Sequence, residues 1–367
     1  MTILHVITSL RTGGAERLVT DLLLHLRREG AEVALLLLDG TRTGLYEEVE
    51  AAGIPVRSLS KGWKAMRNPL LLFRMVRFLR KNPFDVVHTH NTASQLLGAA
   101  ASLFLPLNLV TTEHSTSNRR RSKVWLRPLD QWLYSRYRKI ACVSEDTENA
   151  LLAWLPGLAP KTVVIPNGIR IDRFRNCPPD PVLSGTPGYK VLMVAAFRDP
   201  KDQTTLIRAF RHLPDRYRLY LAGGAETPEE QRRMQECRDL VHMLGLDGQV
   251  LFLGVRKDIP ALIAACDVSV LSTRYEGFGL SVLEAMASGK PVIASHVKSL
   301  DTIVGGAGLL FPPGDATALS TLIREVCEDP EKAADLAEKG RQRAKLYDIA
   351  ETARRYLILY EDLIVER

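Results

Sequence analysis

The sequence has few cysteines and no long apolar run, and each scarcity excludes a class of protein. The five cysteines are scattered without a Cys-x-x-Cys pair, which argues against a disulfide framework and against a zinc site. The most apolar stretch, residues 96–110, contains Pro106 and Asn108 and is too short to span a bilayer. The first residues lack the basic start and the small-residue cleavage site of a signal peptide. We therefore expect a cytoplasmic protein without a transmembrane helix.

The composition is ordinary for a folded protein and favours two domains. The 367 residues exceed the length at which a single hydrophobic core usually stops growing. Hydrophobic residues make up 46% of the chain and charged residues 25%, a balance that argues against disorder.

Short apolar runs alternate with helix-length amphipathic segments, a pattern typical of parallel sheets covered by crossover helices. A stretch rich in proline and glycine, residues 173–188, interrupts the pattern and is predicted to be a linker. We predict Rossmann-like domains over residues 1–172 and 189–348 and a closing helix over residues 349–367. Strands are predicted at 3–8, 32–38, 56–59, 86–89, 108–112, 139–143 and 162–165, and then at 189–194, 218–222, 250–253, 268–271, 291–294 and 308–311.

The most informative motif lies in residues 272–291. The segment leaves an apolar strand, passes through a glycine-containing turn and enters a helix that ends at Gly289. The start of such a helix presents free backbone N–H groups and the positive end of the helix dipole, which suit a diphosphate. Glu276 lies in the turn and Glu284 lies eight positions later in the helix. Two carboxylates at this separation can accept hydrogen bonds from hydroxyls on different parts of one ligand, such as a sugar and a ribose.

This segment resembles the signature of glycosyltransferase family 4, the retaining glycosyltransferases of group 1, and in particular members that act in bacterial polysaccharide biosynthesis. In that family two glutamates stand in the frame Glu-Gly-Phe-Gly…Glu-Ala-Met-Ala-Ser/Cys-Gly-x-Pro, which residues 276–291 match. The resemblance implies the α/β fold called GT-B, in which two Rossmann-like domains face each other across a cleft and the C-terminal helix crosses back to the first domain. It also implies retaining transfer from a nucleotide-sugar without a metal ion or a cofactor.

The resemblance further implies which residues of the second domain hold the donor. Glu276 would orient the sugar hydroxyls, Glu284 would bind the ribose, and the helix start would hold the diphosphate. Lys201 and Arg198 would clamp the diphosphate and stabilise the leaving group. The sequence departs here from the family's commonest pattern, because Ala196 occupies the usual arginine position. The residues expected to bind the donor are Gly13, Gly14, Arg198, Lys201, Glu276, Gly277, Phe278, Gly279, Leu280 and Glu284.

In the first domain, candidate ligand-binding residues follow predicted strands, where open α/β sheets place ligands. Gly13 and Gly14 resemble the family's glycine loop, whose backbone amides approach the donor phosphate. His114 would contact the transferred sugar at the reacting carbon, so the resemblance implies a catalytic set of His114, Lys201, Arg198 and Glu276. His88 and His90 close the preceding strand, and a structural role is the simpler interpretation for both.

Positive charge is concentrated in the first domain. Residues 57–139 contain 16 Lys or Arg and three acidic residues, whereas the whole chain has a net charge of +7. Tryptophans among these charges suit an anionic membrane surface, although ordinary helices with solvated basic faces are the alternative. The predicted membrane or acceptor face comprises Lys64, Arg67, Arg119, Arg120, Arg121 and Trp125.

These features predict a hexosyl- or N-acetylhexosaminyltransferase that is peripheral on the inner face of the cytoplasmic membrane. A UDP-sugar is the favoured donor and a GDP-sugar the alternative. The expected acceptor is a glycan or a polyprenyl-diphosphate-linked saccharide in surface polysaccharide or glycolipid synthesis. Two other functions stay open, a nucleotide-sugar epimerase of the same fold class and a non-catalytic subunit of a glycan-assembly complex. The sequence contains no recognised nucleic-acid-binding module, so nucleic acid is not an expected partner.

Overall fold

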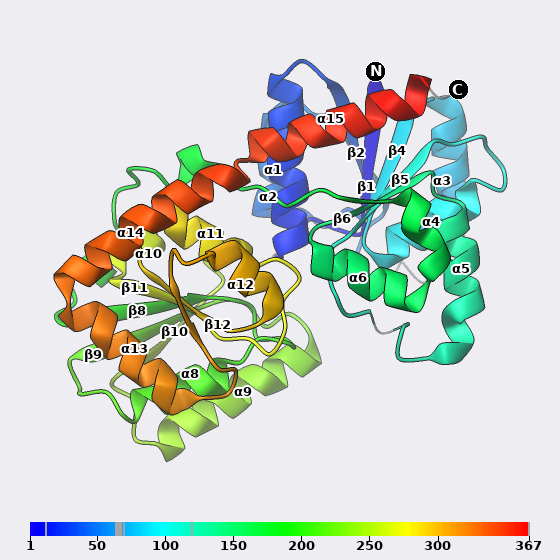
Figure 1. The fold of residues 1–367 in the computed structure, drawn as a ribbon. Helices are drawn as coiled ribbons and strands as arrows, with labels where there is room; N and C mark the ends of the chain where they lie inside the picture. Colours follow the sequence, from blue (N-terminus) through cyan, green and yellow to red (C-terminus); the bar gives the residue numbers. More distant parts are fainter. Residues whose placement is uncertain (12, 63–67, 69, 119, 366–367) are drawn as a thin grey trace. The chain divides into compact units, whose positions relative to one another are not determined.

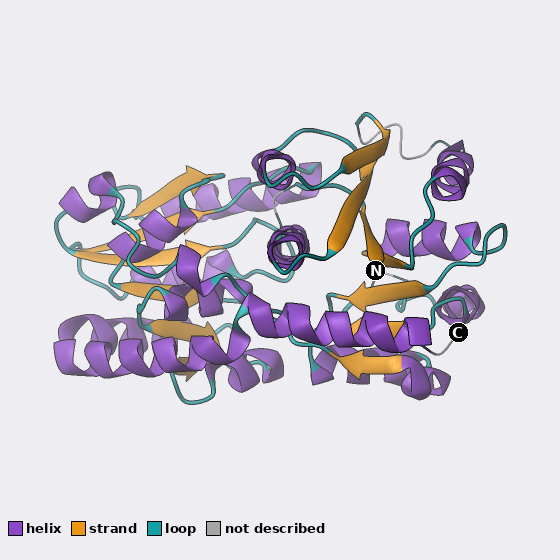
Figure 2. Cartoon of the chain, turned by 90° about the horizontal axis from the view of Figure 1, so that it is seen from above, coloured by secondary structure: helices purple, strands orange, loops and turns teal. Residues whose placement is uncertain are grey.

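The computed structural model describes residues 1–11, 13–62, 68, 70–118 and 120–365, and the chain divides into two compact units (Figure 1). The first unit comprises Met1–Gly168 and Ile349–Arg367, and the second comprises Ile169–Asp348. The chain therefore completes most of one unit, builds the other, and returns to the first through its last helix. In Figure 2, helices lie on both sides of the strands of each sheet.

The first unit contains a parallel sheet of seven strands in the order β3-β2-β1-β4-β5-β6-β7. The order reverses between β1 and β4, and open α/β sheets bind ligands beyond the carboxyl ends of the strands at such a switch point. The strands are β1 (Thr2–Ile7), β2 (Glu32–Asp39), β3 (Val56–Ser60), β4 (Val86–His90), β5 (Leu109–Glu113), β6 (Lys139–Cys142) and β7 (Thr162–Val164). The helices are α1 (Gly14–Arg28), α2 (Gly44–Ala51), α3 (Leu70–Lys81), α4 (Thr92–Ala101), α5 (Arg127–Ser135), α6 (Glu145–Trp154) and α15 (Ile349–Val365).

The second unit repeats this arrangement with six parallel strands in the order β10-β9-β8-β11-β12-β13, so its switch point lies between β8 and β11. The strands are β8 (Tyr189–Val194), β9 (Tyr217–Ala222), β10 (Val250–Gly254), β11 (Val268–Leu271), β12 (Val292–Ser295) and β13 (Leu309–Phe311). The helices are α7 (Pro181–Gly185), α8 (Gln203–Phe210), α9 (Pro228–Met243), α10 (Ile259–Ala265), α11 (Leu280–Ala287), α12 (Lys298–Val304), α13 (Ala316–Glu328) and α14 (Pro330–Ala344). Every predicted strand is present with bounds shifted by at most one residue.

The division between the units lies earlier than the sequence predicts. The second unit begins at Ile169, so residues 169–172 and the expected linker, residues 173–188, belong to it. Asp180 anchors this segment, because its side chain accepts hydrogen bonds at the start of α7 and forms an ion pair with Arg256 at 2.8 Å. The proline-rich composition indicated a linker, but it did not show that an acidic side chain inside the segment ties it to the second unit.

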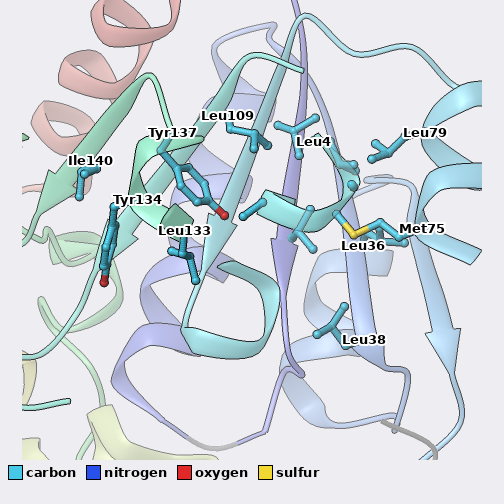
Figure 3. Close-up of a cluster of buried hydrophobic side chains, with 14 of the residues drawn as sticks. Leu4, Leu36, Leu38, Met75, Leu79, Leu109, Leu133, Tyr134, Tyr137 and Ile140 are labelled. Carbon is cyan, nitrogen blue, oxygen red and sulfur yellow. The ribbon is translucent and has the colours of Figure 1, made fainter. Parts of the chain in front are cut away.

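The core of the first unit follows from the alternation of side chains along its strands. Leu4 and Leu36 are buried on one face of the sheet and belong to a cluster that includes Met75 of α3 and Tyr137 (Figure 3). The neighbour of Leu4 in β1, His5, contacts Tyr360 of α15 instead. One face of this sheet is therefore mostly apolar, whereas the other carries a polar group beneath α15.

The predicted closing helix forms as α15 (Ile349–Val365), which packs against α1 in the first unit (Figure 1). Its predicted apolar positions are buried, namely Tyr356, Leu359, Tyr360 and Leu363. Among the described residues, no helix has both the length and the hydropathy needed to cross a bilayer.

Candidate functional site

The glutamate motif of the second unit folds into the turn and helix that the sequence predicts. It follows β11 and enters α11 through Gly279, which has a φ of 96°. This positive φ favours glycine, and a Cβ at this position would also collide with the side chain of Leu300. Gly279 has no side chain that could cap the helix, and the first backbone N–H groups of α11 therefore suit an anionic ligand.

Lys201 and Glu276 meet in the second unit, although 75 positions separate them in the sequence. Their side chains form an ion pair and are 16% and 15% exposed. A backbone bridge between Lys201 and Thr273 fixes the lysine against the loop that carries the motif. The backbone carbonyl of Glu276 also accepts a hydrogen bond from Ser299 at 2.8 Å. The fold thus places a cation and a carboxylate together beside the start of α11.

The other two polar residues expected in this region are placed less tightly. Arg198 is exposed in the loop after β8, and among the described residues its side chain forms no ion pair. Its backbone carbonyl accepts a hydrogen bond from Lys201 at 2.8 Å, so the two cations belong to one loop. Glu284 is partly buried within α11, one helical turn after Leu280. The structure therefore joins Lys201 to Glu276 directly and leaves the Arg198 side chain outside that pair.

In the first unit, His114 directly follows β5 and belongs to a group of four histidines that also includes His5 within β1, His88 within β4 and His90 at the end of β4. His5 and His88 are opposite each other in the register of β1 and β4, and His90 follows two residues later on the same face. Nδ1 of His5 lies 3.0 Å from Nε2 of His90, and Nδ1 of His90 lies 3.2 Å from Nε2 of His114. A second set of contacts joins His88 to α15, with Nδ1 of His88 at 2.6 Å from the hydroxyl of Tyr360.

Burial keeps these imidazoles uncharged at neutral pH. Desolvation lowers the pKa of His5 to about 3 and the pKa of His114 to about 4. The pKa values of His88 and His90 are also well below the ordinary value, because of burial first and the neighbouring histidines second. Each ring therefore carries one N–H donor and one acceptor nitrogen.

His5, His88 and His90 lie close enough for a metal ion, since one nitrogen from each can be chosen with all three within 4.8 Å of one another. Both nitrogens of His88, however, already have hydroxyl partners, Tyr360 and Thr112. Both nitrogens of His90 have histidine partners as well. A metal ion would have to displace these contacts, so the geometry favours a hydrogen-bonded network.

The glycine loop of the first unit precedes α1. Gly13 is the N-cap residue with a φ of −177°, an extended conformation that any residue adopts, and no side chain caps the helix. Gly14 is the exposed first residue of α1. The start of this helix therefore also presents backbone N–H groups that could donate hydrogen bonds to a phosphate.

Two features of the strand ends were not predicted. Asn91 directly follows His90 with a φ of 63°, and its side chain is held by Thr8 and Ser94. Gly223 follows β9, and a Cβ there would collide with the carbonyl oxygen of Ala195 after β8. In the sequence, the glycine pair at residues 223–224 could have indicated a close approach of two backbone segments. No local sequence feature indicated the positive φ of Asn91.

The predicted membrane face is wrong at two positions. Arg120 is 9% exposed, and its Nε lies 3.0 Å from Oδ1 of Asp130. Nη2 of Arg121 lies 3.0 Å from Oε2 of Glu113. Asp130 and Glu113 are themselves buried, and buried carboxylates require a cation or several hydrogen bonds. Trp125, in contrast, is 73% exposed. The remaining members of the predicted face, Lys64, Arg67 and Arg119, lie outside the described residues.

Comparison with known proteins identifies the class to which this fold and site belong. The family described as Glycosyltransferase Family 4 matches residues 12–173, and the family described as Glycosyl transferases group 1 matches residues 181–343. The chain belongs to the group 1 glycosyltransferases of family 4, and the predicted two-domain α/β fold of the GT-B class is confirmed.

Individual relatives extend over most of the chain. The sequence is 27% identical over 360 residues to phosphatidyl-myo-inositol mannosyltransferase of Mycobacterium leprae, covering 95% of this chain and 93% of the relative. It is 23% identical over 347 residues to UDP-Gal:alpha-D-GlcNAc-diphosphoundecaprenol alpha-1,3-galactosyltransferase of Escherichia coli, covering 88% and 86%. The crystal structure of Anabaena HepE in complex with UDP-glucose matches with a TM-score of 0.87 and 25% identity, covering 99% of this chain and all of HepE.

Proposed function

We propose that the chain transfers a hexose or N-acetylhexosamine from a nucleotide-diphosphate sugar to a lipid-linked saccharide in surface polysaccharide or glycolipid synthesis. A UDP-sugar is the favoured donor, with a GDP-sugar as the alternative. The observation that carries the proposal is the Lys201–Glu276 ion pair beside the start of α11. A cation and free N–H groups suit the diphosphate, and a carboxylate suits the sugar hydroxyls.

The ion pair also suggests how the donor is received. Glu276 neutralises Lys201 in the structure, and an incoming diphosphate offers Lys201 a more highly charged partner. Glu276 is then free to accept hydrogen bonds from the sugar. We assign Lys201 and Arg198 to the diphosphate, Glu284 to the ribose, and residues 277–280 to the backbone contacts. In the first unit, His114 contacts the sugar and Gly13 and Gly14 supply amides to the phosphate.

We propose a retaining reaction in which the diphosphate departs from the sugar face that the acceptor hydroxyl approaches. An oxygen of the leaving diphosphate takes the acceptor's proton, and the anomeric carbon passes through an oxocarbenium-like state. The negative charge on the diphosphate is met by Lys201, Arg198 and the start of α11, which together can replace a metal ion.

Three similar proteins support the donor and the acceptor class. HepE was crystallised with UDP-glucose, and the Escherichia coli relative is named for a UDP-sugar donor and a diphosphoundecaprenol-linked acceptor. The Mycobacterium leprae relative carries a phospholipid, phosphatidyl-myo-inositol, in its name.

We propose that the first unit reaches such an acceptor at an anionic membrane surface through α3. The buried side of this helix includes Met75 and Leu79, and its exposed side includes Phe73, Arg77 and Arg80. Phe73 is 77% exposed. An aromatic ring beside arginines on one helix face is typical of helices that lie in a membrane interface. This face replaces Arg120, which is buried, and Arg121, which is partly buried and paired with Glu113.

A thermal-shift panel of UDP- and GDP-sugars tests the donor assignment, because a ligand that binds only the folded state raises Tm. We expect one nucleotide class to raise Tm of the wild-type protein and to lose most of this effect in Lys201→Ala. Lys190→Ala is the matched control, since Lys190 pairs with Asp267 at 3.5 Å near the start of β8. A panel in which no nucleotide-sugar shifts Tm, or in which both lysine variants respond like wild type, contradicts the proposed donor site.

A further inference from the structure

The proposed reaction uses one of the four clustered histidines of the first unit and leaves His5, His88 and His90 without a function. His5, His90 and His114 form a continuous chain of ring nitrogens, at 3.0 Å for the first contact and 3.2 Å for the second. The two nitrogens at the ends of this chain, Nε2 of His5 and Nδ1 of His114, are shielded from solvent and have no partner among the described residues.

Proton counting couples the three rings. Each neutral imidazole has one N–H and one acceptor nitrogen, and each contact needs one donor and one acceptor. If Nδ1 of His5 donates to Nε2 of His90, the proton of His90 is on Nδ1 and is donated to Nε2 of His114. The proton of His114 must then be on Nδ1. If His5 instead carries its proton on Nε2, His90 and His114 must also carry their protons on Nε2. The tautomer of His114 is therefore set through His90 by His5.

Burial favours one of the two proton arrangements along the three rings. His5 is fully buried in the middle of β1, whereas His114 follows β5 at the strand end and is partly exposed as a residue, although its Nδ1 is as shielded from solvent as Nε2 of His5. A buried N–H without a partner is costly, and it is tolerated best where a ligand can meet it. The favoured arrangement therefore leaves an acceptor nitrogen at His5 and an N–H at Nδ1 of His114.

The rest of the network holds these rings in place. The ring of His88 lies 4.1 Å from the ring of His90, centroid to centroid. Nε2 of His88 is 2.7 Å from the hydroxyl of Thr112, which lies 2.9 Å from the hydroxyl of Tyr356 on α15. Burial lowers the pKa of His114 to about 4, so its ring is neutral at pH 7.

We propose that His90 and His5 are positioning residues that fix His114 as the neutral tautomer with its proton on Nδ1, ready to donate a hydrogen bond to an oxygen of the transferred sugar. This inference rests on the proposed function in one respect, the contact between His114 and the sugar. A neutral donor suits a reaction whose sugar becomes positively charged, because an imidazolium at the same place would repel the oxocarbenium-like state.

The direct test is the tautomer of His114, measured by NMR on the full chain with ¹⁵N-labelled histidine. We expect wild-type His114 to carry its proton on Nδ1 at neutral pH. An Nε2-protonated or doubly protonated His114 would overturn the inference.

Two variants of His90 separate positioning from packing. The amide of Asn can occupy the place of Nδ1, which contacts His114, whereas the amide of Gln can occupy the place of Nε2, which contacts His5. We expect His90→Asn to retain the Nδ1 tautomer of His114 and most of kcat, and His90→Gln to lose the tautomer and lower kcat about tenfold with KM for the donor little changed. If both variants behave alike, His90 only fills space.

His88→Gln provides the control, because His88 lies in the same cluster but outside the chain of three rings. It should lower stability and leave the proton of His114 on Nδ1. A changed His114 tautomer in this variant would overturn the inference. A wild-type protein that shows the expected tautomer but transfers no sugar would contradict the proposed function alone.

Discussion

At the residue scale, Lys201 and Glu284 carry the donor assignment. We expect Lys201→Ala and Glu284→Ala each to lower kcat/KM by at least about tenfold, roughly 1.4 kcal/mol of transition-state stabilisation, without unfolding the protein. Steady-state kinetics with circular dichroism as the folding check provide the measurement. Turnover close to wild type in both variants would remove these residues from the site.

The four clustered histidines predict a loss of stability in mild acid. In the unfolded chain a histidine titrates near its ordinary pKa of 6.5, whereas in the folded protein burial lowers the pKa of His5 to about 3 and that of His114 to about 4. Between these values the unfolded chain binds more protons, so the free energy of unfolding falls as the pH falls from about 7 towards 4. Each such histidine contributes on the order of 1–2 kcal/mol between pH 7 and pH 5.

Urea unfolding at pH 7.5 and pH 5 measures this loss. All four tryptophans of the sequence lie in the first unit, so their fluorescence reports on the unit that contains the histidines. The variant His5→Phe removes one titrating group and should show a weaker dependence on pH. Equal stability at both pH values would mean that the histidines are charged or accessible to water.

Arg121 has a structural role that differs from the surface role expected of it. Removing its guanidinium in Arg121→Ala leaves Glu113 buried beside Tyr134 and Gln95 without a cation. We expect a loss on the order of 3 kcal/mol in the free energy of unfolding, as for other broken buried pairs. The exposed neighbour Lys123 is the control, and Lys123→Ala should change stability by less than about 0.5 kcal/mol. A small effect for both would show that Glu113 is satisfied by its two hydrogen bonds.

At the element scale, periodicity determines what the sequence can predict. The strands were located to within one residue because each is a short, buried apolar run between turn-forming segments. The face of α3 was also predictable, since Met75 and Leu79 repeat at helical spacing and are buried. The anchoring of residues 173–188 was not, because it depends on Arg256, far away in the sequence.

The candidate site shows the same limit. The start of α11 and its glycine were readable as a local motif, but the contact between Lys201 and Glu276 depends on how β8 and β11 pair. His5 could not be singled out, because a lone histidine in an apolar strand indicates nothing until His88 is placed opposite it. Arg120 and Arg121 were misassigned because a run of basic residues does not show which of them face buried acids.

The exposed face of α3 predicts membrane binding that depends on charge. Each basic residue near an anionic surface contributes about 1 kcal/mol, so Arg77→Ser with Arg80→Ser should weaken binding roughly ten- to thirtyfold. Co-sedimentation with anionic and with neutral vesicles, at low and at high salt, measures this. Arg354 and Arg355 on α15 are matched surface arginines, and replacing both should have little effect. Wild-type protein that ignores anionic vesicles at low salt would favour a soluble acceptor.

At the scale of the whole molecule, the two units supply different parts of one proposed reaction. We assign the nucleotide-sugar to the second unit, through Lys201, Arg198, Glu276 and Glu284. The first unit provides the histidine network and the basic, partly apolar face of α3. This division accounts for a chain in which positive charge is concentrated in one half, while the dense glycine and glutamate motif lies in the other.

The most direct test of the account is acceptor-dependent release of nucleotide in the presence of EDTA. The purified chain would be incubated with each UDP- and GDP-sugar, with and without a polyprenyl-diphosphate-linked saccharide, and released nucleotide and glycolipid product would be quantified. We predict release with one donor class, only when the acceptor is present, with the anomeric configuration of the donor retained and with no effect of EDTA. A changed donor sugar without acceptor would indicate an epimerase, and no turnover with any donor would indicate a non-catalytic subunit. Either result, or activity that EDTA abolishes and Mg²⁺ or Mn²⁺ restores, would contradict the proposed metal-independent sugar transfer.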